Sequence, residues 1–161
     1  MEEKNKAWKT VSSKYLFRRP WLTVRCEDML LPNGNHIPEY YILEYPDWVN
    51  TIAITKEGKF VFVRQYRPGI GRTCYELCAG VCEKEDASPL VSAQRELWEE
   101  TGYGNGNWQE YMVISANPST HTNLTYCFLV TDVELIDHQH LEATEDLSVH
   151  LLTLEEVKRL L

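Results

Sequence analysis

One segment of the chain carries local signals for both ends of a helix, and it lies between segments that favour strands. Ser88 is a good N-cap, and Pro89 suits the first helical position, where its missing N–H costs nothing. Gly102 can end the helix, because glycine readily takes the left-handed conformation found at helix C-termini. Between these ends a narrow apolar stripe recurs at helical spacing, formed by Leu90, Ala93, Leu97 and Thr101. The sequence therefore predicts one central helix, around which the other elements must pack.

Strands are predicted on the N-terminal side of this helix. Runs rich in aromatic and β-branched residues indicate strands at residues 8–17, 21–31, 37–45, 48–55, 59–66 and 73–79. Turn residues separate the second run from the third at Pro32-Asn33-Gly34-Asn35, and the fourth from the fifth at Lys56-Glu57-Gly58. These two turns predict two β-hairpins.

The C-terminal side of the helix also favours strands, at residues 108–115, 124–133 and 147–152. The segment 153–156 has the pattern of a capping box, which predicts a short terminal helix to Leu161. Strands on both sides of a central helix, followed by a final helix, indicate an α+β fold or a mixed α/β/α sandwich. The chain has 161 residues and no Pro/Gly/Ser-rich linker or internal repeat divides it.

Charge and composition narrow the possible partners. The net charge is −8, from 24 acidic and 16 basic residues, which disfavours a nucleic-acid binder. The same charge would repel a polyphosphate substrate, so an enzyme acting on one needs divalent cations or local arginines. No apolar stretch approaches the ~20 residues of a membrane span. Five cysteines, an odd number, and no visible secretory signal predict reduced thiols in a cytoplasmic protein.

Three glutamates of the predicted helix share one face. Glu96, Glu99 and Glu100 stand at positions i, i+3 and i+4, so their carboxylates repel one another. One interpretation is a solvated acidic face, which would also oppose the helix dipole near its C-terminal end. The other is a site for Mg²⁺ or Mn²⁺, whose coordination requires crowded oxygen ligands and would offset the repulsion. Gly80, at the end of the preceding strand, would let the backbone approach such a ligand closely.

The segment 80–103 resembles the Nudix box, the signature of a family of pyrophosphohydrolases. Its second half matches completely, as Arg95-Glu96-Leu97-Trp98-Glu99-Glu100-Thr101-Gly102-Tyr103. Fourteen residues separate Gly80 from Arg95, one more than the family spacing, so the early glutamate of the box is represented by Glu85 or Asp86. The resemblance implies a Nudix-type α/β/α sandwich with a mixed β-sheet.

Three further segments look like the ADP-ribose pyrophosphatase group of this family. They are Leu31-Pro32-Asn33-Gly34, Val63-Arg64-Gln65-Tyr66-Arg67 and Glu76-Leu77-Cys78-Ala79-Gly80, where Cys78 replaces the proline usual in the group. In that group the N-terminal strands form a small antiparallel subdomain that helps to build a homodimer. The resemblance therefore implies a dimerising β subdomain at residues 1–45 and a hydrolase domain at residues 46–161.

The resemblance also implies which groups hold the metal. Glu96 and Glu100 would be the main ligands, Glu99 would assist, and the carbonyl of Ala79 would complete part of the shell. Mg²⁺ is the expected ion, and Mn²⁺ is a possible replacement. In a late loop the group uses a further acid to bind metal or to activate water, and here Glu145 matches that position best, with Glu142 as the second choice.

Other implied roles are structural or concern the general base. Arg95 would pair with a loop carboxylate and hold the box together, and Gly80 and Gly102 would have structural roles. Three glutamates remain open as the catalytic general base: Glu99, Glu145 and Glu142.

Four residues are candidates for substrate contacts, each with a simpler alternative. Arg64 and Arg67 would contact phosphate, or form surface ion pairs. His121 would contact phosphate or base, or be an ordinary polar loop residue. Trp21 would stack on adenine, as N-terminal aromatic residues do in related dimers, or pack in the core like the other tryptophans.

The expected activity is metal-dependent hydrolysis of the pyrophosphate bond of a nucleoside diphosphate derivative, with ADP-ribose or another sugar nucleotide as substrate. The products would be a nucleoside monophosphate and a sugar phosphate. The loop after Pro118, Asn117-Pro-Ser-Thr-His-Thr-Asn123, lacks the acid that many relatives carry there. A nucleoside triphosphate or a dinucleotide therefore stays open as the substrate, and a non-catalytic nucleotide-sensing module stays open as a different class.

Overall fold

The computed structural model describes residues 6–160, which form two compact units. The first unit contains the described residues up to Tyr45 together with the loop Ser115–Asn123, and the second contains Pro46–Ile114 and the chain from Leu124 onwards. The expected boundary at residue 46 would place that loop in the hydrolase domain. It joins the first unit because its backbone bonds to the end of a strand there: Leu43 donates to the Thr120 carbonyl at 2.8 Å, and Thr122 donates to the Leu43 carbonyl at 3.1 Å.

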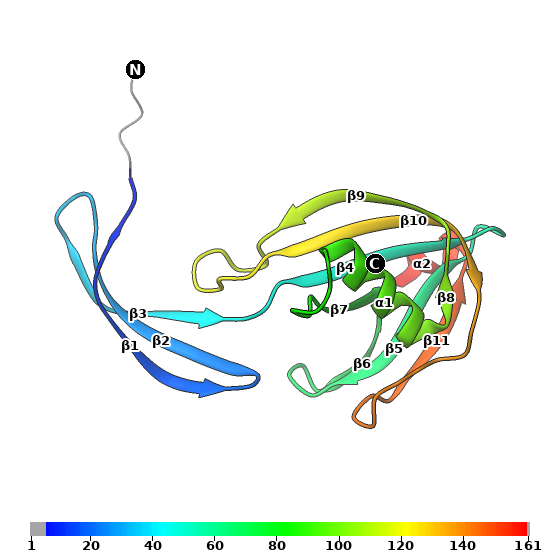
Figure 1. The fold of residues 1–161 in the computed structure, drawn as a ribbon, viewed down its shortest axis with the longest axis horizontal. Helices are drawn as coiled ribbons and strands as arrows, with labels where there is room; N and C mark the ends of the chain where they lie inside the picture. The colour runs from blue at the N-terminus through cyan, green and yellow to red at the C-terminus, as the bar shows by residue number, and fades with distance from the viewer. Residues whose placement is uncertain (1–5, 161) are drawn as a thin grey trace, which may run out of the picture. The chain divides into compact units, whose positions relative to one another are not determined.

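Three antiparallel strands make the sheet of the first unit, in the order β1-β2-β3. They are β1 (Lys9–Arg19), β2 (Leu22–Leu30) and β3 (His36–Glu44), labelled in Figure 1. Every residue of β1 is exposed, whereas β2 in the middle of the sheet is largely half-buried. On β2, Arg25 pairs with Glu27 and with Glu44 of β3, so charged groups as well as backbone bonds join these two strands.

An eight-stranded mixed sheet forms the second unit, with β11-β5-β4-β10-β8 as its main order. Strands β4 and β10 are parallel, and the other pairs are antiparallel. β6 pairs with β5, β7 with β4, and β9 with β10. The strands are β4 (Trp48–Thr55), β5 (Phe60–Arg67), β6 (Arg72–Glu76), β7 (Cys78–Val81), β8 (Tyr103–Gly104), β9 (Asn107–Ile114), β10 (Thr125–Leu135) and β11 (Leu147–Leu152).

The predicted strand at 73–79 is two strands in the structure. It is interrupted at Leu77, because β6 continues the hairpin with β5 while β7 leaves it and pairs with β4. The two-residue strand β8 was not predicted, being too short for an alternating pattern. The change of partner at Leu77 matters for the site, since it places β7 under the helix that follows.

Helix α1 (Pro89–Thr101) has the predicted ends. The Ser88 hydroxyl accepts a hydrogen bond from the Val91 N–H, and Gly102, with φ +74°, donates its N–H to the Trp98 carbonyl at 2.8 Å. The buried stripe differs at its start: Leu90 is 36% exposed, and Ser92 is fully buried with its hydroxyl donating to the Ser88 carbonyl. That hydrogen bond allows a polar residue to occupy a core position.

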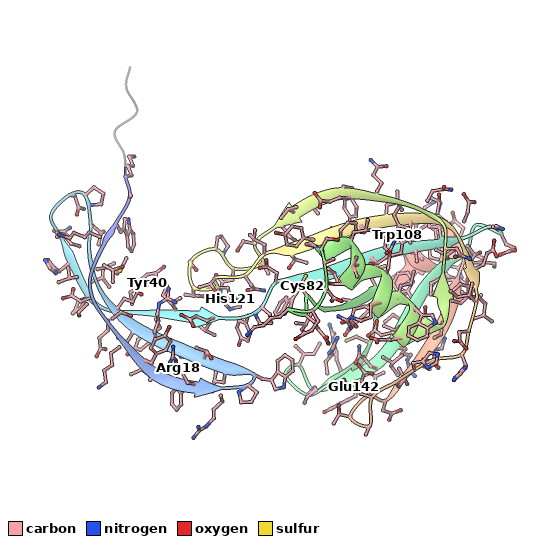
Figure 2. The ribbon with its side chains drawn as sticks, in the orientation of Figure 1. Arg18, Tyr40, Cys82, Trp108, His121 and Glu142 are labelled. Carbon is pink, nitrogen blue, oxygen red and sulfur yellow. The ribbon has the colours of Figure 1, made fainter. Side chains whose placement is uncertain are left out.

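The core of the second unit lies between α1 and the sheet. The helix packs on β7 and β4, as Figure 1 shows. One cluster surrounds Leu97 and a second surrounds Ala93, and Trp108, labelled in Figure 2, packs against both. Their buried members are Ala53, Val61, Cys78, Leu97, Val130 and Val133 in the first, and Val49, Ala93 and Phe128 in the second.

The terminal helix α2 (Leu154–Leu160) contacts β11. Its predicted capping box is present, because Thr153 and Glu156 exchange side-chain-to-backbone hydrogen bonds of 2.7 and 3.2 Å. A mixed sheet with two helices and a separate antiparallel sheet confirms the predicted α+β class. No helix within residues 6–160 has the length and apolar character needed to cross a membrane.

Two constraints require glycine at position 102, and substitutions at two glycines can separate their contributions to stability. Its φ of +74° disfavours other residues, and a Cβ there would also overlap the backbone carbonyl of Asp137. Gly58 has almost the same φ, +75°, but a Cβ on it would meet no described atom within 4 Å. We predict that Gly58→Ala lowers the free energy of unfolding by about 1–2 kcal/mol, the cost of the left-handed conformation, and that Gly102→Ala lowers it clearly further. Urea unfolding of both variants measures the difference, and equal losses would contradict the close packing.

Candidate active site

Two glutamates of α1 are fastened to the backbone of β7. The Ala79 N–H donates to Oε2 of Glu100 at 3.3 Å, and the Val81 N–H donates to Oε1 of Glu96 at 3.2 Å. The helical spacing of these glutamates thus matches the two-residue spacing of amides along the strand. Both carboxylates are thereby held toward the sheet, which removes them from the solvated acidic face that was the alternative for this pattern.

The burial of these carboxylates raises their pKa values. Glu100 is only 5% exposed, and burial raises its pKa to about 7; the charges of Glu96 and Glu145 add to the rise, while hydrogen bonds from Cys78 and Ala79 oppose it. Burial is also the main cause of the raised pKa of Glu96. The protein therefore places negative charge here that its own groups only partly neutralise, which is what a bound cation would correct.

Arg95 joins the helix to the loop before it. Its guanidinium donates to Asp86 at 3.1 Å, to the Val81 carbonyl at 3.0 Å and to Glu99 at 2.9 Å. A further hydrogen bond of 3.0 Å reaches Glu96. Of the two loop acids that could represent the early glutamate of the box, Asp86 makes this pair, and Arg95 is the main cause of its lowered pKa.

Gly80 provides the space in which the Glu96 carboxylate lies. A Cβ at this position would overlap the carboxyl carbon and both oxygens of Glu96. Glycine is therefore required by close approach rather than by an unusual backbone angle. Gly80 lies between the two residues whose amides bind the glutamates, Ala79 for Glu100 and Val81 for Glu96.

The two arginines of β5 differ in their partners. Arg67 forms a two-pronged ion pair with Glu76, with three N···O distances from 2.6 to 3.0 Å. The hydrogen bond to Glu76 is the main cause of the raised pKa of Arg67, and the charge of Glu100 contributes. Arg64 lies with its guanidinium carbon 5.6 Å from the centre of the Tyr75 ring. Arg67 thus forms the ion pair that was the alternative to phosphate binding, whereas Arg64 has a cation–π contact only slightly inside the usual range.

The late acidic loop lies between β10 and β11, where Figure 2 labels Glu142. The Glu145 carboxylate accepts the Glu142 N–H at 2.8 Å, and the Glu145 N–H donates to the Glu142 carbonyl at 3.0 Å. Glu145 is close enough to Glu100 for its charge to raise the pKa of that residue. The charge of Glu145 therefore acts on the carboxylate cluster of α1.

Trp21 and His121 belong to the first unit. Trp21 is 71% exposed, so the core packing that was the alternative for it does not occur. The His121 ring, labelled in Figure 2, lies 5.3 Å from the ring of Tyr45, and its buried Nδ1 has no hydrogen-bond partner within the described chain. A ligand could therefore contact the exposed indole of Trp21 or form a hydrogen bond with Nδ1 of His121.

Sequence reasoning missed the contacts that fix the C-terminal end of α1. Gln139 donates its side-chain amide to the Glu100 carbonyl at 2.7 Å, and the His140 N–H donates to the Glu99 carbonyl at 2.8 Å. It also missed the burial of the Cys78 thiol beside Glu100, where burial and then the charge of Glu100 raise the pKa of the thiol. No local pattern marks these residues, because each acts through a partner far away in the chain.

The raised pKa of Glu100 predicts how the metal-free protein responds to pH. The folded carboxyl titrates at about 7 against an ordinary value of 4.5, so the folded state binds its proton more tightly than the unfolded state. The contribution of Glu100 to the free energy of unfolding is then fully present below pH 4.5 and is lost as pH rises through about 7. The loss is up to about 3 kcal/mol for a shift of this size. We predict that Glu100→Gln clearly reduces this decline and leaves the share that comes from the raised pKa of Glu96, measured by denaturant unfolding with chelator present.

Glu110, an exposed glutamate of β9, supplies the matched control. Glu110→Gln should keep the wild-type decline between pH 5 and 8. If wild type and Glu100→Gln lose stability in parallel over this range, another group causes the pH dependence.

Comparisons with known proteins match both parts of the chain. The family model of the nucleoside diphosphate sugar hydrolase N-terminal domain matches residues 8–43, and that of the NUDIX domain matches residues 45–161. An ADP-ribose pyrophosphatase of Bacillus subtilis (strain 168) is 31% identical over 153 residues, covering 94% of this chain and 82% of that protein. A methanol dehydrogenase activator of Bacillus methanolicus is 30% identical over 149 residues, covering 92% and 80%.

A solved structure, described as the crystal structure of ADP compounds hydrolase, has the same fold. It matches with a TM-score of 0.81 at 21% identity, covering 98% of this chain and 85% of that one. The resemblance read from the box in residues 80–103 is thus confirmed, and the chain belongs to the Nudix family.

Proposed function

We propose that this Nudix pyrophosphohydrolase cleaves the pyrophosphate bond of a nucleoside diphosphate sugar, with ADP-ribose as the first candidate. The reaction is attack of water on one phosphorus, giving a nucleoside monophosphate and a sugar phosphate. The observation that carries the proposal is the pair of buried carboxylates, Glu96 and Glu100, held against β7 with incomplete neutralisation. The matched N-terminal domain and the relatives that are ADP-ribose pyrophosphatases support the choice of substrate.

Mg²⁺ is the proposed cofactor, and Mn²⁺ fits the same oxygen donors. Glu96 and Glu100 would hold it, with Glu99, the Ala79 carbonyl and Glu145 as further ligands. When bound, such a cation neutralises charge on the phosphate oxygens and makes an attacking water more acidic. The raised pKa values of Glu96 and Glu100 support this assignment, because a cation would favour the ionised form of both.

Residues around the ligands keep them in position. Arg95, paired with Asp86 and the Val81 carbonyl, ties the helix to the loop that leads into it. Gly80 gives the Glu96 carboxylate its space, and Gly102 ends the helix directly after Glu100 and Thr101. We assign positioning roles to these three residues.

Three glutamates are proposed for proton removal from water: Glu145, Glu99 and Glu142. Glu145 is the first choice, because its charge acts on Glu100. Glu99 is one-third exposed, but its carboxylate already accepts a hydrogen bond from Arg95. Glu142 is exposed, and its backbone N–H, rather than its carboxylate, makes the contact with Glu145.

Phosphate and base contacts are proposed for four side chains. Arg64 is a better phosphate ligand than Arg67, since Arg67 would first have to release Glu76. The exposed indole of Trp21 offers a face for stacking on adenine. His121 could donate or accept a hydrogen bond through Nδ1, which lacks a partner within residues 6–160.

A homodimer is also proposed, formed through the first unit. Within the described chain β1 pairs only with β2, so its other edge is open. Val11, Tyr15 and Phe17 on β1 are each at least two-fifths exposed, which is unusual for an isolated edge strand. A second copy of the chain would cover these apolar side chains.

We place the enzyme in the cytoplasm, which the five free cysteines support.

The dimer is tested by light scattering coupled to size-exclusion chromatography. Wild type should elute with twice the mass of the 18.8 kDa chain. The double variant Val11→Lys, Phe17→Lys should elute as a monomer with unchanged circular dichroism, because two charges would be buried without partners. The matched variant Leu135→Lys, at an exposed residue of β10, should stay dimeric. A monomeric wild type at micromolar concentration would refute the dimer.

The activity is tested on a panel of ADP-ribose, other sugar nucleotides, dinucleotides and nucleoside triphosphates, with Mg²⁺ or Mn²⁺. We expect AMP and ribose phosphate from ADP-ribose. Glu100→Gln should lower kcat by at least about a hundredfold while the fold survives. Removal of a residue that only hydrogen-bonds to a metal ligand typically costs less, about 10–100-fold, so the expected loss distinguishes a ligand from such a residue. Glu110→Gln should retain wild-type activity.

Other outcomes separate the alternatives. Cleavage of a triphosphate or dinucleotide in preference to sugar nucleotides would refute the substrate and keep the mechanism. Full activity of Glu100→Gln would refute the metal assignment. Tight nucleotide binding without turnover of any compound would indicate a sensing module.

A further inference from the structure

We infer that Asp137, His138 and His140 form a second metal site, separate from the glutamates of α1 and suited to Zn²⁺. Each of the three residues offers one ligand atom, and these atoms all lie within 4.8 Å of one another. The inference does not depend on the proposed function, because none of the three residues belongs to the carboxylate cluster.

Both histidine rings already contact the Asp137 carboxylate, one at each oxygen. Oδ1 of Asp137 lies 2.7 Å from Nδ1 of His138, and Oδ2 lies 3.0 Å from Nε2 of His140. The two imidazole rings are tilted by 42° to each other, with their centres 4.3 Å apart. Ligand atoms about 3.3 Å apart surround a tetrahedral Zn²⁺ with bonds of about 2.0–2.1 Å, so small side-chain rotations would complete the site.

The backbone of this segment is already fixed on the C-terminal end of α1. The Asp137 N–H donates to the Gly102 carbonyl at 3.1 Å, and the His140 N–H donates to the Glu99 carbonyl at 2.8 Å. The His140 ring stacks on Trp98, with ring centres 4.2 Å apart and planes 30° apart. The Asp137 carboxylate also accepts the His138 N–H at 2.8 Å. Two ligands, Asp137 and His140, are therefore held before any ion arrives, which lowers the ordering cost of binding.

The donor set distinguishes this site from the glutamate site. Two imidazole nitrogens and one carboxylate suit Zn²⁺ and similar transition metals, whereas Mg²⁺ prefers oxygen donors alone. Three protein ligands leave a fourth position to water, as is common where zinc is not purely structural. The bound ion would also tie the 137–140 segment to the helix end that carries Glu99 and Glu100.

The site is tested by calorimetric titration of Zn²⁺ into the full chain in excess Mg²⁺, which is added to compete at the proposed glutamate site. Wild type should bind one Zn²⁺ per chain, and His138→Ala should bind it at least tenfold more weakly. His138 is 79% exposed, so its removal leaves the fold intact. His36→Ala is the matched control, because His36 is also exposed and lies 3.2 Å from an aspartate, Asp28, but has no second histidine in the cluster.

Two further measurements complete the test. Glu96→Gln, Glu100→Gln should keep the Zn²⁺ affinity of wild type, which separates this site from the proposed catalytic one. Long-range ¹H–¹⁵N spectra should show Zn²⁺-induced shifts of the His138 and His140 ring nitrogens and none for His36. Absence of saturable Zn²⁺ binding in wild type, equal affinity in His138→Ala, or loss of binding only in the glutamate double variant would each overturn the inference.

Discussion

Much of the second unit depends on the hydrogen bonds that β7 donates to the carboxylates of α1. The Ala79 and Val81 amides hold Glu100 and Glu96 toward the sheet, where water cannot solvate the charges fully. Each buried carboxylate opposes folding unless a partner compensates it. The compensation is partial, because the pKa of Glu100 stays near 7. The unit is therefore built around negative charge that its own groups only partly neutralise, and this charge supports the cation site proposed at the glutamate face.

The same constraint explains why the end of α1 is supported from outside. Free carbonyl groups at a helix C-terminus carry partial negative charge, and here they adjoin the glutamates. The last turn of α1, described in full, has no basic side chain to offset them. Donors come instead from Gly102 and from the segment after β10, through Gln139 and the His140 N–H. This segment must approach closely, which accounts for the lack of space at Gly102. Helix end, loop and carboxylates thus form one interdependent arrangement.

Local signals in the sequence predicted most of the elements but not the partners with which they pair. Ser88, Pro89 and Gly102 mark the helix ends by capping chemistry, and the structure has those ends. The glutamate spacing and the resemblance of the box also led to the correct family. What local signals did not contain is pairing over distance: the change of partner at Leu77, the bond between Leu43 and the loop Ser115–Asn123, and the ion pair of Arg67 with Glu76. Periodicity reports which face is apolar, and these contacts depend on which strand arrives beside it.

The division of the chain into two units has a consequence for how substrate choice relates to chemistry. All the carboxylates proposed to hold metal or move a proton belong to the second unit, as do Arg95 and the two arginines of β5. Trp21 and His121, proposed to contact the nucleoside, belong to the first, which the chain enters twice, through its N-terminal strands and through the loop Ser115–Asn123. The roles proposed for the glutamates and those proposed for Trp21 and His121 therefore rest on residues that pack in different units, and separate substitutions can test them.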